Sequence, residues 1–192
     1  MIALVVALRS AGGSSNTAAS TSATPRPSPT ATPLAALSSG GTGQAIDGIQ
    51  CQATESLYHI HAHLAIYVNG VKRGVPEGLG IAPPRHVVQS DAGPLVESGK
   101  CSYWLLTHTD DGIIHVEAPT QTAYTLGQFF AVWGQPLAAD QIGPASGTLI
   151  VYVNGQRYTG DPQQITLTPH ELIQLDVGTD VPPQPFTFPP GY

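Results

Sequence analysis

Residues 58–70 have the sequence YHIHAHLAIYVNG, which predicts the element around which the fold forms. Alternating and β-branched residues followed by Asn-Gly are typical of a β-strand that ends in a tight hairpin turn. Successive side chains of a strand point to opposite faces, so one face of this strand is continuously apolar and suits a core. The other face carries three imidazoles, about 6.5 to 7 Å apart along the strand. These imidazoles belong to His59, His61 and His63.

A second pair of histidines lies in residues 101–119, where two strand-like runs meet at Asp111-Gly112. An Asp-Gly pair between two strands is typical of a two-residue type I′ turn. That turn predicts that His108 lies directly opposite His115, with Cβ atoms about 5 Å apart. A three-residue loop with a bulge would instead shift the register and separate the two rings.

The histidines of these two segments favour a transition-metal site. Neutral imidazole is the commonest metal ligand, and a His-x-His pair with one more histidine from a neighbouring strand leaves an open coordination position. The only methionine is Met1 and both cysteines are expected in a disulfide, so copper(I) has no soft donors here. Copper(II), zinc and nickel(II) remain, with copper(II) first in the affinity order and zinc close behind. The expected metal ligands are His59, His61, His63, His108 and His115.

Glu117 shares the expected face of His115 and is the carboxylate of most interest. It is expected either to accept a hydrogen bond from an imidazole N–H or to act as a general base. Simple solvation of the side chain is the alternative.

Metal capture, buffering or delivery is the expected function, and two other functions fit the same histidines. A zinc lyase or hydrolase with three histidine ligands would use a metal-bound water for catalysis. A histidine-faced structural or adhesion module would pack its rings on Tyr67 and Trp104 and need no metal. Catalysis without a metal has little support, because the chain has no nucleophile-elbow motif and no glycine-rich phosphate loop.

The ends of the chain and its cysteines indicate export. Residues 1–10 contain an apolar run that resembles the remnant of a signal sequence and is far shorter than the roughly 20 residues that span a bilayer. Residues 11–48 are rich in Ser, Thr, Ala and Pro, which predicts a disordered stalk. Cys51 and Cys101 predict a disulfide and hence a secreted, periplasmic or cell-surface protein. The alternatives are a low-complexity tail on a cytosolic protein and two separate thiols.

Charge gives no sign of a polyanionic partner. Charged residues make up 10% of the chain, the net charge is -6, and Lys and Arg do not cluster. We therefore expect no nucleic-acid surface and no membrane span, and a metal ion is the partner that the sequence indicates. Protein partners are left open.

The remaining pattern predicts one α+β domain over residues 49–180 and a Pro-rich tail over residues 181–192. Residues 124–136 carry the one clear helix, with a capping box formed by Thr125 and Gln128. The strand-like runs around it predict a mostly antiparallel sheet with the helix lying across it. This arrangement is β-grasp-like, with the histidine-bearing hairpin added at the N-terminal side.

Three motifs together resemble those of a family of secreted prokaryotic proteins of uncharacterised function. They are HIHAHL, THxDxGIIHVE and YTLGQFFxVWGQP, and the resemblance covers about residues 55–178. It implies one exported domain and carries no particular activity.

Overall fold

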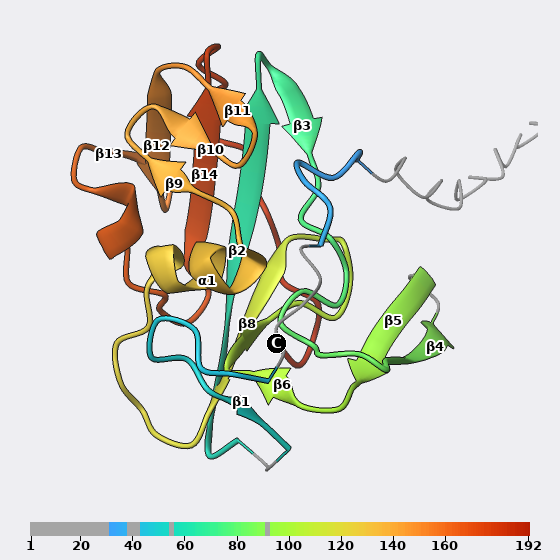
Figure 1. The fold of residues 1–192 in the computed structure, drawn as a ribbon. Coiled ribbons are helices and arrows are strands. Elements are labelled where there is room, and N and C mark those ends of the chain that lie inside the picture. Colours follow the sequence, from blue (N-terminus) through green and yellow to red (C-terminus); the bar gives the residue numbers. More distant parts are fainter. Residues whose placement is uncertain (1–30, 38–42, 54–55, 91–92) are drawn as a thin grey trace, which may run out of the picture.

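The computed structural model describes residues 31–37, 43–53, 56–90 and 93–192 (Figure 1). The signal-like residues 1–10 and most of the expected stalk lie outside these ranges. Residues 31–37 and 43–48, which were expected to belong to the stalk, pack on the domain. Leu34 is buried, and Trp133 Nε1 donates a hydrogen bond to the carbonyl oxygen of Ala36. The ordered domain therefore begins earlier in the chain than the composition indicated.

A seven-stranded sheet forms the centre of the fold (Figure 1). Its strands are β2 (Tyr58–Val68), β3 (Val71–Arg73), β7 (Leu105–Leu106), β8 (Ile113–Ala118), β12 (Leu149–Val153), β13 (Gln156–Tyr158) and β14 (Leu172–Val177). The strand order is β13-β12-β14-β2-β8-β7, and β3 pairs with the C-terminal end of β2. β14 runs parallel to β2, whereas the other neighbours are antiparallel. This confirms the predicted class, a mostly antiparallel sheet with one helix.

The histidine strand β2 lies in the middle of this sheet. β8 pairs with its first half, and the last strand, β14, lies parallel to it on the other edge. A first strand with an antiparallel neighbour on one side and the last strand parallel on the other is a β-grasp-like order. The histidine strand is thus the first strand of the β-grasp-like sheet and not an addition to it. The local pattern could not reveal this, because the parallel pairing joins the two ends of the domain.

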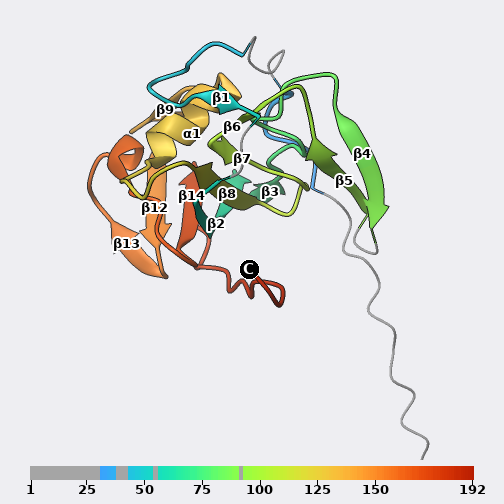
Figure 2. The ribbon, with the colours of Figure 1, turned by 90° about the horizontal axis from the view of Figure 1, so that it is seen from below.

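The helix α1 (Leu126–Trp133) packs on one face of the sheet (Figures 1 and 2). The predicted capping box is confirmed: the backbone N–H of Gln128 donates to Thr125 Oγ1, and the backbone N–H of Thr125 donates to Gln128 Oε1. The apolar stripe of the helix is buried against the apolar face of β2 and β8 and consists of Leu126, Phe129, Phe130 and Trp133. Because this core occupies one face of β2, the histidines point away from the helix.

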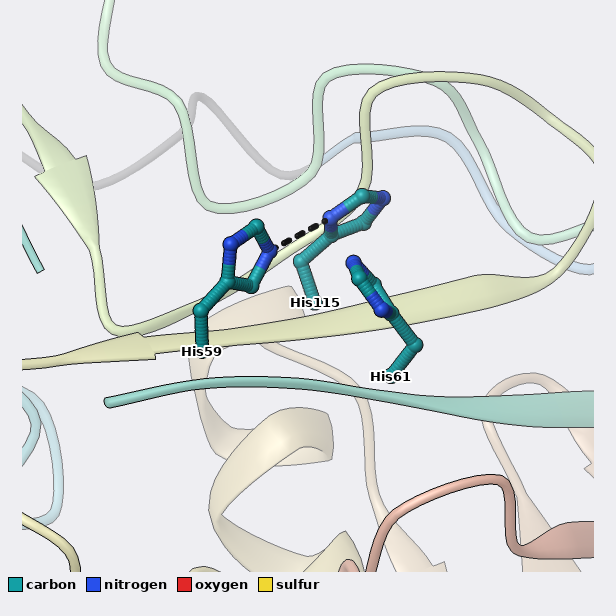
Figure 3. Close-up of side chains that lie close together, drawn as sticks. All are labelled: His59, His61 and His115. Carbon is teal, nitrogen blue, oxygen red and sulfur yellow. Dashed lines mark hydrogen bonds between the residues drawn. The ribbon is translucent and has the colours of Figure 1, made fainter. Parts of the chain in front are cut away.

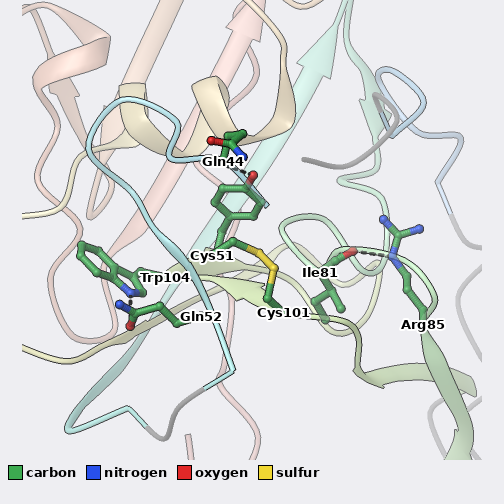
Figure 4. Close-up of a disulfide and its surroundings, with 8 residues drawn as sticks. Gln44, Cys51, Gln52, Ile81, Arg85, Cys101 and Trp104 are labelled. Atoms are coloured by element: carbon green, nitrogen blue, oxygen red, sulfur yellow. Dashed lines mark hydrogen bonds between the residues drawn. A yellow bond between two sulfur atoms is a disulfide. The ribbon is translucent and has the colours of Figure 1, made fainter. Parts of the chain in front are cut away.

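Smaller elements border the main sheet. They are β1 (Cys51–Gln52) paired with β6 (Ser102–Tyr103), the ribbon of β4 (His86–Ser90) and β5 (Gly93–Ser98), the small sheet of β9 (Leu137–Ala138), β10 (Gln141–Ile142) and β11 (Ala145–Ser146), and the 3₁₀ helix η1 (Pro162–Gln164). The predicted disulfide between Cys51 and Cys101 is present and ties β1 to the start of β6 (Figure 4). Beside it, Trp104 Nε1 donates to Gln52 Oε1 over 3.0 Å.

A small apolar cluster and the C-terminal residues 181–192 cover parts of the sheet face that carries the histidines (Figure 2). Leu106 lies opposite His115, and together with Ile81 and Val96 it forms a small apolar cluster that is separate from the main core. On the other side, residues 181–192, the predicted tail, cross the face opposite α1 (Figure 2). Within the described ranges, no helix has the length and hydrophobicity needed to traverse a membrane.

Candidate metal centre

The pairing of β2 with β8 brings the first histidines together. His61 lies directly opposite His115, and His59 lies directly opposite Glu117. Directly opposed residues share a face, so these four side chains gather on the side of the sheet away from α1. The ring centroid of His61 is 4.5 Å from that of His59 and 4.6 Å from that of His115 (Figure 3).

His108 reaches the same group from a loop. β7 pairs with β8 through Leu106 and His115, so the predicted direct pairing of His108 with His115 across a two-residue turn is wrong. The reason lies in Thr107, whose buried hydroxyl donates to the carbonyl oxygen of Pro76 and accepts from the backbone N–H of Leu79. These bonds end β7 before His108 and lengthen the connection. The rings of His108 and His115 nevertheless lie 4.6 Å apart, centroid to centroid.

The Nδ1 atom of His108 lies 2.6 Å from the carbonyl oxygen of Val96 on β5. A carbonyl only accepts, so Nδ1 carries a proton. Nε2 donates to Glu117 when the ring is protonated, and it offers its lone pair to a metal when it is not. That Nε2 is directed at Glu117, 3.4 Å away. The ribbon β4–β5 therefore orients His108 as a ligand through Nε2.

Glu117 places its carboxylate among three of the imidazoles. Its Oε1 lies 3.5 Å from His59 Nε2, 3.4 Å from His108 Nε2 and 3.6 Å from His115 Nδ1. His59 Nε2 and His115 Nδ1 are 3.4 Å apart. Four ligands about 2.0 to 2.1 Å from a tetrahedral zinc ion would lie about 3.3 to 3.4 Å from one another. The four distances therefore come close to four of the six edges of such a tetrahedron.

Among the residues that the structure describes, two groups of side chains could hold a metal ion. They are His59, His61 and His115, and His108, His115 and Glu117, and within each group the ligand atoms lie within 4.8 Å of one another. His115 belongs to both groups and is buried, with 5% of its surface exposed. It is therefore the residue on which either arrangement depends.

The structure does not bring His63 together with the other four histidines. Its ring stacks on that of Phe186, with centroids 3.6 Å apart and planes inclined by 10°. Its Nε2 lies 3.2 Å from the carbonyl oxygen of Asp111. His63 shares the face of His59 and His61, but these two contacts occupy its ring and one of its nitrogens.

The sequence analysis considered Tyr67 and Trp104 as aromatic neighbours of the histidines, but it did not predict that Tyr192 borders the cluster. The ring of Tyr192 lies 4.6 Å from that of His61 and 5.7 Å from that of His115, centroid to centroid. The only signal was the aromatic content of residues 186–192, which reads FTFPPGY. Such a short Pro-rich stretch has no periodicity from which a packed position could be predicted.

No family model matches the chain, and comparisons with curated proteins and with solved structures gave no significant match. The resemblance to a family of secreted prokaryotic proteins stays a prediction. The chemistry of the site is therefore argued from its own geometry.

Burial keeps most of the imidazoles neutral at pH 7, which leaves their nitrogen lone pairs free to bind a metal. Desolvation by burial, together with the neighbouring imidazoles, lowers the pKa of His115 to about 2 and that of His61 to about 4. His108 differs: burial opposes its charged form, but hydrogen bonds to Glu117 and to the carbonyl of Val96 raise its pKa. Burial also opposes the charge on Glu117, but the neighbouring His108 lowers the pKa of that carboxyl. An ionised carboxylate among mainly neutral imidazoles is the protonation state that metal binding requires.

The metal-free protein is expected to lose stability as the pH falls from about 6.5 towards 4. Unfolded histidines titrate near 6.5, whereas burial lowers the pKa of His61 and His63 to about 4 in the folded chain. Between these values the unfolded state binds more protons, so acid favours unfolding. The stability that these two neutral histidines contribute is fully present above pH 6.5 and is lost as the pH falls towards their folded pKa of about 4. Thermal unfolding in EDTA measures it, and a midpoint that rises on acidification contradicts it.

Proposed function

We propose that this domain binds one divalent transition-metal ion, zinc or copper(II), and captures, buffers or delivers it outside the cytoplasm. The observation that carries the proposal is the position of Glu117 Oε1, 3.4 to 3.6 Å from nitrogens of His59, His108 and His115. These four residues are the proposed ligands. His61 adjoins them as a fifth donor.

The types of donor atom limit which metals the site can bind. Three imidazole nitrogens and one carboxylate oxygen suit zinc and copper(II), and neither thiolate nor thioether takes part. The four donor distances of 3.4 to 3.6 Å are close to those around a tetrahedral ion and favour zinc, because copper(II) prefers a tetragonal arrangement. Zinc is therefore the first ion to test.

Holding an ion fits this donor set better than catalysis does. Catalytic zinc sites keep one position open for water or substrate, whereas structural sites are closed by four protein ligands. With Glu117 as the fourth ligand, the proposed site is closed. The disulfide between Cys51 and Cys101 supports a compartment outside the reducing cytosol.

Metal analysis of protein purified without a histidine tag tests the proposal. The protein is stripped with EDTA, loaded separately with zinc and with copper(II), desalted and analysed by mass spectrometry. We expect about one ion per chain for at least one of the two metals. His86→Ala is the matched control and should retain the same amount, because His86 lies exposed on β4 and pairs with Glu97. A wild-type protein that retains neither metal overturns the proposal.

A further inference from the structure

Residues 181–192 cross the histidine face of the sheet (Figure 2), and their aromatic rings pack on it. Each of the three aromatic rings in this segment contacts at least one histidine. Phe186 stacks on His63, and the ring of Phe188 lies 4.8 Å from that of His170. Tyr192 contacts His61, a member of the metal-binding cluster. We call residues 181–192 the strap.

Buried polar groups hold the beginning of the strap. Asp176 on β14 is fully buried, and its Oδ2 accepts a hydrogen bond from the backbone N–H of Val181 over 2.9 Å. Gln174 Nε2 donates both to Asp176 and to the carbonyl oxygen of Val181, while Gln174 Oε1 accepts from the backbone N–H of Gln184. A buried carboxylate is costly unless it is hydrogen-bonded, so this network fixes the residues that it binds. The first four residues of the strap are therefore firmly attached.

The far end of the strap is held differently. Tyr192 is 36% exposed, and its contacts are ring contacts with His61 and His115. Its carbonyl oxygen lies 2.8 Å from Nε2 of His170, at an exposed position. Exposed contacts of this kind break more readily than a buried hydrogen-bond network. The strap is thus anchored at residues 181–184 and releasable at Tyr192.

The position of Tyr192 matters for access to the metal centre. Strands β2 and β8 form the floor of the cluster. One side is formed by the loop that carries His108, which is hydrogen-bonded to Val96 of the ribbon β4–β5. Tyr192 covers His61 and His115, whereas the side chain of His59 is 47% exposed. With the strap in place, an ion reaches His59 from solvent, but His115, the ligand shared by both groups, stays covered by Tyr192. With Tyr192 displaced, His61 and His115 also become accessible.

We propose that the strap controls metal exchange, and that displacement of Tyr192 from His61 and His115 is the step that sets the rate of loading and release. The inference rests on the proposed function, since it concerns the same centre. The strap covers ligands without contributing one, so its removal changes both rates in the same direction. The equilibrium affinity then changes little.

Zinc release to the chromophoric chelator 4-(2-pyridylazo)resorcinol, followed by stopped flow, tests the strap. Tyr192→Ala is expected to release and to load zinc about five- to tenfold faster, which corresponds to the loss of two aromatic contacts. Tyr192→Phe keeps the ring and should behave like the wild type. Phe186→Ala is the matched control: it removes a ring of the same strap that stacks on His63, a residue outside the proposed ligands.

The outcomes separate the strap from the proposed function. If the wild type retains zinc but Tyr192→Ala exchanges it at the wild-type rate, the proposal that the strap controls exchange is overturned, whereas the proposed metal centre is supported. Equal acceleration by Phe186→Ala also overturns the role of Tyr192. If the wild type retains no metal, both proposals fall. Because Tyr192 is partly exposed at the releasable end of the strap, we expect its variants to fold normally.

Discussion

Replacing His115 with alanine is expected to lower zinc affinity by about 100-fold or more. His115 belongs to both groups of potential ligands, so its loss leaves neither with three donors. Its Nδ1 lies 3.4 Å from His59 Nε2 and 3.6 Å from Glu117 Oε1, which makes it a shared corner of the proposed cage. Removing even an outer hydrogen-bond partner of a metal ligand costs about 10- to 100-fold in affinity, and a direct ligand should cost at least as much. Competition with a fluorescent zinc chelator at pH 7 measures the change.

His63→Ala provides the matched control. Like His115, His63 is buried on the face of the sheet opposite α1, and each is 5% exposed. It differs in that its contacts are Phe186 and the carbonyl oxygen of Asp111. Zinc affinity should therefore stay close to that of the wild type. Loss of zinc in His63→Ala together with its retention in His115→Ala would show that the ion binds elsewhere on the strand.

The features that the sequence predicted correctly depend on local geometry. The alternation along residues 58–68 determined which face of β2 enters the core, and the buried side chains Ala62, Leu64 and Ile66 confirm it. The capping box at Thr125 is likewise a contact between residues three positions apart. Such features need no knowledge of the rest of the fold.

The features that the sequence did not predict depend on distant pairings. The parallel alignment of β14 with β2 places the histidine strand at the centre of the sheet, and no residue of β2 encodes that choice. His108 was assigned to a strand because Asp111-Gly112 resembles a two-residue turn, whereas Thr107 bonds to the segment at Pro76 and Leu79 and ends β7 early. Tertiary hydrogen bonds overrode the turn preference.

The candidate site shows the same division. Five histidines were recognised as a group from composition and alternation, but the sequence could not show that His63 would stack on Phe186. Glu117 was expected beside the histidines as an acceptor or base. Its position among three imidazole nitrogens follows from the register of β2 with β8 and from the approach of His108, which only the tertiary structure provides.

Removing the disulfide by replacing both Cys51 and Cys101 with serine is expected to lower the free energy of unfolding by about 4 kcal/mol. The bridge joins residues 50 positions apart, so without it the unfolded chain gains the entropy of a long open loop. Urea unfolding of the metal-free protein, followed by tryptophan fluorescence, measures the difference. An unchanged urea midpoint would contradict the prediction, and the wild type treated with a reductant should reproduce the effect of the double variant.

The same variant separates the stability of the domain from the integrity of its metal centre. The disulfide ties β1 to the start of β6, whereas the proposed ligands lie on β2, β8 and the loop at His108, so the ligand geometry should survive its loss. A metal that binds only the folded state adds stability, about 2.7 kcal/mol at a free concentration 100 times the dissociation constant. Excess zinc should therefore restore much of the stability that the variant loses. Failure of zinc to raise the urea midpoint of a folded variant would mean that the bridge is needed to assemble the centre itself.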